Sequence, residues 1–223
     1  MEEPLPFASL HPDDGAVAGR LPWPQPDQLD PPRRAVYDRI VGGPRSEGAP
    51  AFALTDDQGR LHGPFNALLI SPQVGDAVQE LGAALRYRSG LSDRCRELAI
   101  LAVAHAHDSA FEWYAHAAVG RRVGLTEPVL DAVRAGRIPR GHLEAVEVVA
   151  LEVAHELLAS RDLGEDAYGA AVDALGLEGI AELITLVGYY QLLALHLAVW
   201  RTPLPADADE ATDAAGGGDP ATA

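Results

Sequence analysis

The sequence predicts an all-α protein, a bundle of about seven or more helices. Apolar residues recur every three or four positions over most of residues 33–200, which is the spacing of amphipathic helices. No two alternating apolar runs flank a short turn, which is the pattern of a β-hairpin. With 223 residues, 48% of them hydrophobic, the chain is long enough to bury one self-sufficient core.

Composition divides the chain into three parts. Residues 1–32 form a proline-rich arm, in which the prolines up to Pro32 disfavour a helix and favour extended backbone. Trp23 is the residue of this arm that we expect to anchor on the domain surface. Residues 33–205 form the helical domain. Residues 206–223 form an acidic tail with too little apolar surface to offset the entropy of ordering, so we expect disorder there.

The first helical segments follow from start and stop signals. Residues 33–41 form a helix that a Gly-Gly pair ends, and a Gly- and Pro-rich connection with turn signals follows it. Residues 66–69 open a short apolar turn. Residues 72–88 form an amphipathic helix, with Ser71 as its N-cap and Pro72 at its first position.

The later segments are delimited in the same way. Ser92 caps a strongly apolar helix over residues 94–105, and a polar break at residues 107–109 separates it from a helix over residues 112–123. Further helices, each bounded by polar residues or Gly, are expected over residues 126–135, 143–159, 165–175 and 179–200.

Charge and cysteine content exclude several functions. The formal net charge of −16 would repel a nucleic acid or an anionic membrane, so we expect neither as a partner. The single cysteine, Cys95, excludes an intrachain disulfide, a CxxC redox pair and a multi-thiolate metal site. The first residues lack the basic start and apolar run of a secretory signal, which leads us to expect a cytoplasmic protein.

Side chains that can carry chemistry concentrate between Arg94 and His116. Glu112 lies four residues before His116, so on one helix the two side chains share a face, where a carboxylate can orient an imidazole and raise its basicity. Glu97, on the preceding helix, would complete an acid-base set. Such a set suits proton transfer at a carbon next to a carbonyl, including the carbanion left when carbon dioxide departs.

This stretch resembles the carboxymuconolactone decarboxylase family, which includes alkylhydroperoxidase-like (AhpD-like) proteins. The resemblance covers about residues 62–205 and implies an AhpD-like helical bundle that forms homo-oligomers, often trimers or hexamers. The segments that carry it, the first three more strongly, are Arg96-Glu-Leu-Ala-Ile100, Glu112-Trp-x-x-His116, Gly124-Leu125, Gly63-Pro-Phe-Asn66 and Gly188-Tyr-Tyr190.

The peroxidase branch of that family uses a Glu, a CxxC pair and a His as a proton relay. The resemblance places Glu97 and His116 at the Glu and His, and it places Ser109 and Glu112 at the two cysteines. A hydroxyl and a carboxylate cannot cycle through a sulfenic acid and a disulfide, so thiol peroxidase activity by that route is excluded. The chain therefore resembles a cysteine-less branch of the family.

The resemblance implies a cofactor-independent enzyme, a carboxy-lyase or isomerase that acts on a small carboxylated or lactone-like compound. Its predicted catalytic residues are Glu97, Glu112 and His116. The predicted substrate contacts are Arg94 or Arg96, whose guanidinium holds a carboxylate in a bidentate fork, together with Trp113 and Tyr189.

Other interpretations of these residues stay open. Ser109 and Glu112 have the spacing of a capping box, in which the Glu folds back onto the helix amide. Glu97 could pair with an arginine, and His116 could be a satisfied interior histidine. At the level of function, the alternative is a non-catalytic oligomeric ligand-binding or scaffold protein that kept the fold.

A metal site is a further alternative. On an unbroken helix, His105, Asp108, Glu112 and His116 would line a stripe of metal ligands, which would suit a metal-dependent hydrolase. The polar break at residues 107–109 would destroy that register, so we expect no metal.

Overall fold

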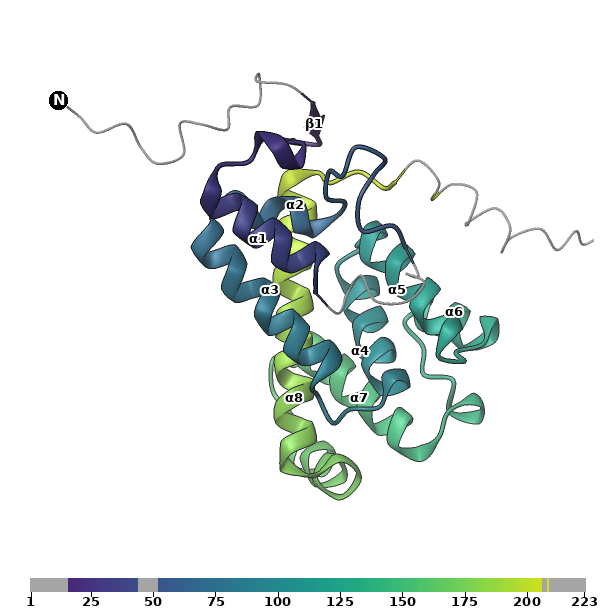
Figure 1. Cartoon of the computed structure of the whole chain (residues 1–223). Helices are drawn as coiled ribbons and strands as arrows, with labels where there is room; N and C mark the ends of the chain where they lie inside the picture. Colours follow the sequence, from purple (N-terminus) through teal and green to yellow (C-terminus); the bar gives the residue numbers. More distant parts are fainter. Residues whose placement is uncertain (1–15, 44–51, 206–207, 209–223) are drawn as a thin grey trace, which may run out of the picture.

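The computed structural model describes residues 16–43, 52–205 and 208, and helices make up most of that part (Figure 1). It contains eight α-helices, which confirms the all-α prediction. They are α1 (Pro31–Val41), α2 (Pro64–Leu68), α3 (Pro72–Tyr87), α4 (Asp93–Ala106), α5 (Ala110–Arg122), α6 (Glu127–Arg134), α7 (Ala145–Ser160) and α8 (Glu165–Trp200). Short 3-10 turns cover Pro26–Gln28 and Arg140–His142. The acidic tail beyond residue 208 lies outside the described residues.

The first helix starts earlier than predicted. We expected the prolines up to Pro32 to disfavour a helix, but α1 begins at Pro31. Asp30 is its N-cap and accepts a hydrogen bond from the Arg33 amide at 3.0 Å. Proline suits the first turn of a helix because its fixed φ is helical and its missing N–H has no partner there in any case. Pro31 and Pro32 therefore form the start of α1 and do not exclude a helix there.

The arm before α1 contains a two-stranded antiparallel ribbon that the sequence did not predict. Strands β1 (Val17–Ala18) and β2 (Leu21–Pro22) are too short to show the alternation by which strands are recognised. Gly19 turns the chain between them with a φ of 64°. A side chain at this position would collide with the backbone of Trp200 and Arg201.

Trp23 anchors the arm, as expected. Its indole Nε1–H donates to the carbonyl of Leu61 at 2.8 Å. The guanidinium carbon of Arg60 lies 3.9 Å from the centroid of the indole ring, in a cation–π contact.

Helix α4 is the centre of the fold, and it packs against α5, α6, α7 and α8. Every residue from Leu98 to Val103 is completely buried. A helix that is apolar on all sides has to be surrounded, and its alanines let the neighbouring helices approach closely. Ser92 caps its first turn by accepting from the Cys95 amide at 3.2 Å.

A sharp break separates α4 from α5 and sets the position of the second helix. Asp108 has a φ of 49°, and the Ser109 amide donates back to the carbonyl of Ala104 at 2.9 Å. The chain reverses here, so α5 runs back along α4 (Figure 1). This arrangement brings His116 of α5 next to Glu97 of α4.

Helix α8 includes both of the last two predicted helices. Gly176, with φ 68° and ψ 172°, breaks the helical geometry between them, at the place where the sequence predicts a gap. By length and composition α8 could cross a membrane, and 44% of its most apolar window is buried within the fold. The core helices of soluble proteins meet the same criteria.

Candidate active site

The centre of the site is a hydrogen bond between two buried side chains. His116 Nδ1 lies 2.7 Å from Glu97 Oε2, and the two residues are 5% and 1% exposed. A carboxylate can only accept, so Nδ1 carries the proton and Nε2 keeps its lone pair. Burial lowers the pKa of His116, while the Glu97 carboxylate acts in the opposite direction. The imidazole is therefore a neutral base with a fixed tautomer.

Glu112 is the second acid of the site, and its environment differs from that of Glu97. It is 3% exposed, and neither of its carboxyl oxygens has a hydrogen-bond partner among the described residues. Burial raises the pKa of Glu112 to about 8, and the nearby Ser109 hydroxyl offsets this only in part. At neutral pH, Glu112 is therefore mainly a carboxylic acid with a proton to donate.

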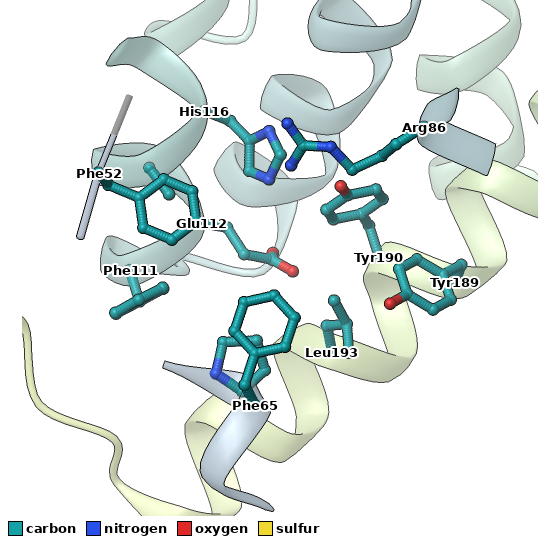
Figure 2. Close-up of a pocket in the computed structure, with 11 residues that line it drawn as sticks. Phe52, Phe65, Arg86, Phe111, Glu112, His116, Tyr189, Tyr190 and Leu193 are labelled. Atoms are coloured by element: carbon teal, nitrogen blue, oxygen red, sulfur yellow. The ribbon is translucent and has the colours of Figure 1, made fainter. Parts of the chain in front are cut away.

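The two side chains line one pocket, whose walls come from five segments of the chain (Figure 2). Its other lining residues are mainly aromatic or apolar: Phe52, Pro64, Phe65, Phe111, Ala115, Tyr189, Tyr190 and Leu193, together with Arg86. The free volume inside is about 30 Å³, which holds one or two water molecules. The pocket is thus narrow, and it is apolar except for a few polar groups.

Arg86, near the end of α3, supplies a cation to this pocket. No carboxylate of the described residues forms an ion pair with it. Burial opposes its charge, but the hydrogen-bonded Tyr190 phenol and the Glu97 carboxylate nearby raise the pKa of Arg86 above its ordinary value. Figure 2 shows the guanidinium beside the His116 ring and the Tyr190 hydroxyl. The guanidinium thus presents a positive charge to the pocket.

The Tyr190 ring also packs against the His116 ring. The two rings meet edge to face with centroids 5.0 Å apart, and Tyr190 packs in the same way on Tyr189 at 5.3 Å. Burial raises the pKa of the Tyr190 phenol, so it remains protonated.

Of the four residues predicted to contact the substrate, Tyr189 lines the pocket. Arg94 instead pairs with Glu147 and the Gly124 carbonyl, and Arg96 pairs with Asp93. Trp113 packs against the main core under Arg134. Arg94, Arg96 and Trp113 do not line this pocket, so their predicted contact with a substrate has no support in its geometry.

The capping box that the spacing of Ser109 and Glu112 allows does not form. Ser109 occupies the N-cap position of α5, but its hydroxyl accepts no hydrogen bond from the helix, and Glu112 extends into the pocket (Figure 2). The predicted pairing of Glu112 with His116 is also wrong, because the imidazole partner is Glu97.

The break at Asp108 interrupts the possible metal stripe. Helix α4 ends at Ala106 and α5 begins at Ala110, so His105 and Glu112 do not share a helix. Within the described part of the chain, no three His, Cys, Asp or Glu side chains gather as metal ligands.

Sequence reasoning missed Arg86, Phe52 and Phe111 as lining residues, whereas Tyr190 falls within the Gly188-Tyr-Tyr190 segment that the resemblance had marked. Phe65 falls within the Gly-Pro-Phe-Asn segment that the resemblance had marked. Gly63 in this segment has a φ of 61°, and a side chain there would collide with the Phe111 ring. That glycine brings α2 and α5 together at the pocket.

A family model matches the segment of the chain that contains several of the site residues. Residues 72–156, which carry Arg86, Glu97, Glu112 and His116, match the model of the carboxymuconolactone decarboxylase family. This segment belongs to the carboxymuconolactone decarboxylase family. The sequence has no significant match among curated proteins.

Solved structures share the fold at low sequence identity. A peroxidase-related protein from Ralstonia eutropha JMP134, described as an alkylhydroperoxidase AhpD core, is 18% identical, with a TM-score of 0.68 over 87% of this chain and 96% of that one. A peroxidase-related protein from Silicibacter sp. TM1040 is 14% identical, with a TM-score of 0.66 over 87% and 95%. The debrominase Bmp8, solved with 2,3,4-tribromopyrrole, is 12% identical, with a TM-score of 0.63 over 91% and 98%.

This carboxymuconolactone decarboxylase-like chain has no CxxC motif. Its one cysteine, Cys95, is buried in the main core, and burial raises the pKa of its thiol. Cys95 does not line the pocket. The site therefore offers acid-base groups and a cation.

Proposed function

We propose that the protein is a cofactor-independent acid-base enzyme, a carboxy-lyase or isomerase that acts on a small carboxylated or lactone-like compound. The observation that carries this proposal is that two groups line the same pocket: a neutral imidazole, which Glu97 orients, and the protonated Glu112. One group can accept a proton and the other can donate one.

The roles follow from the surroundings of each group. His116 Nε2 is the base, and Glu97 stabilises the imidazolium that forms when it takes a proton. Glu112 is the acid, since its buried position favours the neutral form. Because the two lie four residues apart on α5, both can reach the same small molecule.

Arg86 is the proposed carboxylate-binding residue, in place of Arg94 and Arg96. A guanidinium binds a carboxylate through two parallel N–H donors, and this contact is strongest where water is excluded. The aromatic walls around it would cover the apolar body of the substrate.

A screen of carboxylated lactones and β-keto acids, followed by NMR and by carbon dioxide release, tests the proposal. His116→Ala should remove most turnover, by about a hundredfold to ten-thousandfold. The matched control is His107→Ala, because His107 is exposed and does not line the pocket. Full turnover in His116→Ala would show that the active site lies elsewhere.

The narrow cavity favours a second candidate, a non-catalytic ligand-binding or scaffold protein. A free volume of about 30 Å³ leaves little room unless the aromatic walls move. This candidate predicts no turnover of any compound in the screen and no effect of His116→Ala on assembly.

A further inference from the structure

We infer that the site keeps the carboxylate of its substrate and moves a proton, so that the protein is an isomerase or tautomerase of small 2-oxo or unsaturated carboxylic acids. This inference rests on the proposed acid-base function and selects between its two reactions. It is carried by the position of Arg86 relative to His116 and Glu112 in one pocket (Figure 2).

Arg86 supplies a positive charge to the pocket. It is the one arginine or lysine among the described residues that line the pocket, and no carboxylate of the described chain pairs with it. A substrate carboxylate would therefore bind there. Loss of carbon dioxide moves the negative charge of a carboxylate into the neighbouring carbon. A guanidinium that holds the carboxylate stabilises the starting state more than this transition state, so it opposes decarboxylation.

The acid Glu112 and the base His116 both reach the pocket from α5. Glu112 extends from α5 toward the space between Phe65 and Tyr190, and His116 lies one helical turn further along the same helix (Figure 2). With the carboxylate at Arg86, beside His116, the carbon that loses its proton would lie close to the imidazole; this carbon is C3 of a 2-oxo acid or C2 of a β,γ-unsaturated acid. The carbonyl oxygen or the far end of a double bond would then be within reach of Glu112.

The reaction balances without a co-reactant. His116 Nε2 removes a proton from the carbon, and the electron pair of that C–H bond forms a new C=C bond. The displaced π pair takes the proton of Glu112, on the carbonyl oxygen in enolisation or on the remote carbon in a double-bond shift. The product has the same atoms as the substrate. Transfer of the proton from the His116 imidazolium to the Glu112 carboxylate then restores both groups.

Two four-carbon acids separate the two reactions. 2-Oxobutanoate has exchangeable protons next to its carbonyl, and acetoacetate loses carbon dioxide readily. The full-length protein is incubated with each acid in D₂O, and NMR follows deuterium entry while released carbon dioxide is measured. We expect deuterium at C3 of 2-oxobutanoate with the carboxylate retained, and no acceleration of carbon dioxide release from acetoacetate.

Variants assign the activity to the site. His116→Ala should slow the exchange at least a hundredfold. Arg86→Met should raise the 2-oxobutanoate concentration for half-maximal exchange at least tenfold, and it should weaken binding as seen by NMR shifts. Arg88→Met is the matched control, because Arg88 is exposed and pairs with Glu80 outside the pocket.

The outcomes are distinct. Acceleration of carbon dioxide release that depends on His116 would overturn the inference and leave the proposed function standing. Normal exchange in Arg86→Met would also overturn it, since the carboxylate would then bind elsewhere. If neither acid reacts or binds, and the broader screen is equally flat, the proposed function fails and the inference fails with it.

Discussion

Glu97 Oε2 and His116 Nδ1 lie 2.7 Å apart across the interface between α4 and α5, although the two residues are 19 positions apart in the chain. Both helices place these side chains where water is excluded. The carboxylate therefore orients the imidazole and sets which nitrogen carries the proton. The first prediction below depends on this pair, and the comparison of the two N-cap serines concerns the helix termini that position it.

Glu97→Gln should weaken the base while keeping the shape of the site. The Glu97 carboxylate raises the pKa of His116 against the effect of burial, so its loss should lower that pKa further. Titration of the histidine by ¹⁵N NMR measures this directly. Turnover should fall by about a hundredfold or more. An unchanged His116 titration in the variant would contradict the assigned hydrogen bond.

Glu112→Gln should change how stability depends on pH. The pKa of Glu112 is raised from 4.5 to about 8 in the folded state, so its contribution is fully present below about pH 4.5 and is lost as pH rises through 8. The wild type should lose up to about 1.4 kcal/mol of unfolding free energy per pH unit in this window. The glutamine variant should lack this loss.

Urea unfolding at pH 6 and pH 9 measures the difference between the two proteins. The matched control is Glu80→Gln, because Glu80 is exposed and outside the pocket. Parallel pH profiles for wild type and Glu112→Gln would show that Glu112 ionises normally, and the acid role would be lost.

The two N-cap serines should respond differently to alanine. Ser92 accepts a hydrogen bond from the Cys95 amide, so Ser92→Ala should cost about 0.5 to 2 kcal/mol of unfolding free energy. The Ser109 hydroxyl is buried without a partner among the described residues, so Ser109→Ala should change stability by less than about 0.5 kcal/mol. Chemical denaturation compares them. An equal loss in both variants would indicate that Ser109 caps α5 in solution.

We propose that the protein forms a symmetric homo-oligomer, a trimer or hexamer, through the outer face of α8. Apolar side chains that are 37–67% exposed follow one another along this helix at spacings of seven, eight, three and four: Leu177, Ile184, Leu192, Leu195 and Val199. Such a stripe is typical of helix pairing. Light scattering should give a multiple of 23.6 kDa, and Leu195→Glu should reduce it. A wild-type mass of 23.6 kDa at micromolar concentration would contradict the proposal.

Much of the fold was predictable because its signals are local. The cap Ser92, the break at residues 107–109 and the gap at Gly176 are each encoded within a few residues. Their predicted positions agree with the structure to within a few residues. The start of α1 was misjudged because proline disfavours the interior of a helix but suits its first turn.

The site was only partly predictable, because its members come from distant segments. Glu97, Glu112 and His116 were predicted together as an acid-base set, but the sequence did not show that Glu97, and not Glu112, contacts His116. Arg86 gives no local signal, since a basic residue in the last turn of a helix is expected for the helix dipole alone. Arg94 was a plausible carboxylate binder until the structure paired it with Glu147, 53 positions later.

The ribbon near the start of the chain has a consequence for the order in which the fold can close. The Arg20 amide donates to the Trp200 carbonyl at 2.8 Å, and its guanidinium donates to the Val199 carbonyl, 179 positions away. Carbonyls in the last turn of a helix lack partners within it, so the beginning of the chain completes its final helix. During synthesis, this contact can form only after Trp200 has left the ribosome. The ribbon must therefore wait for the end of α8 before this contact can form.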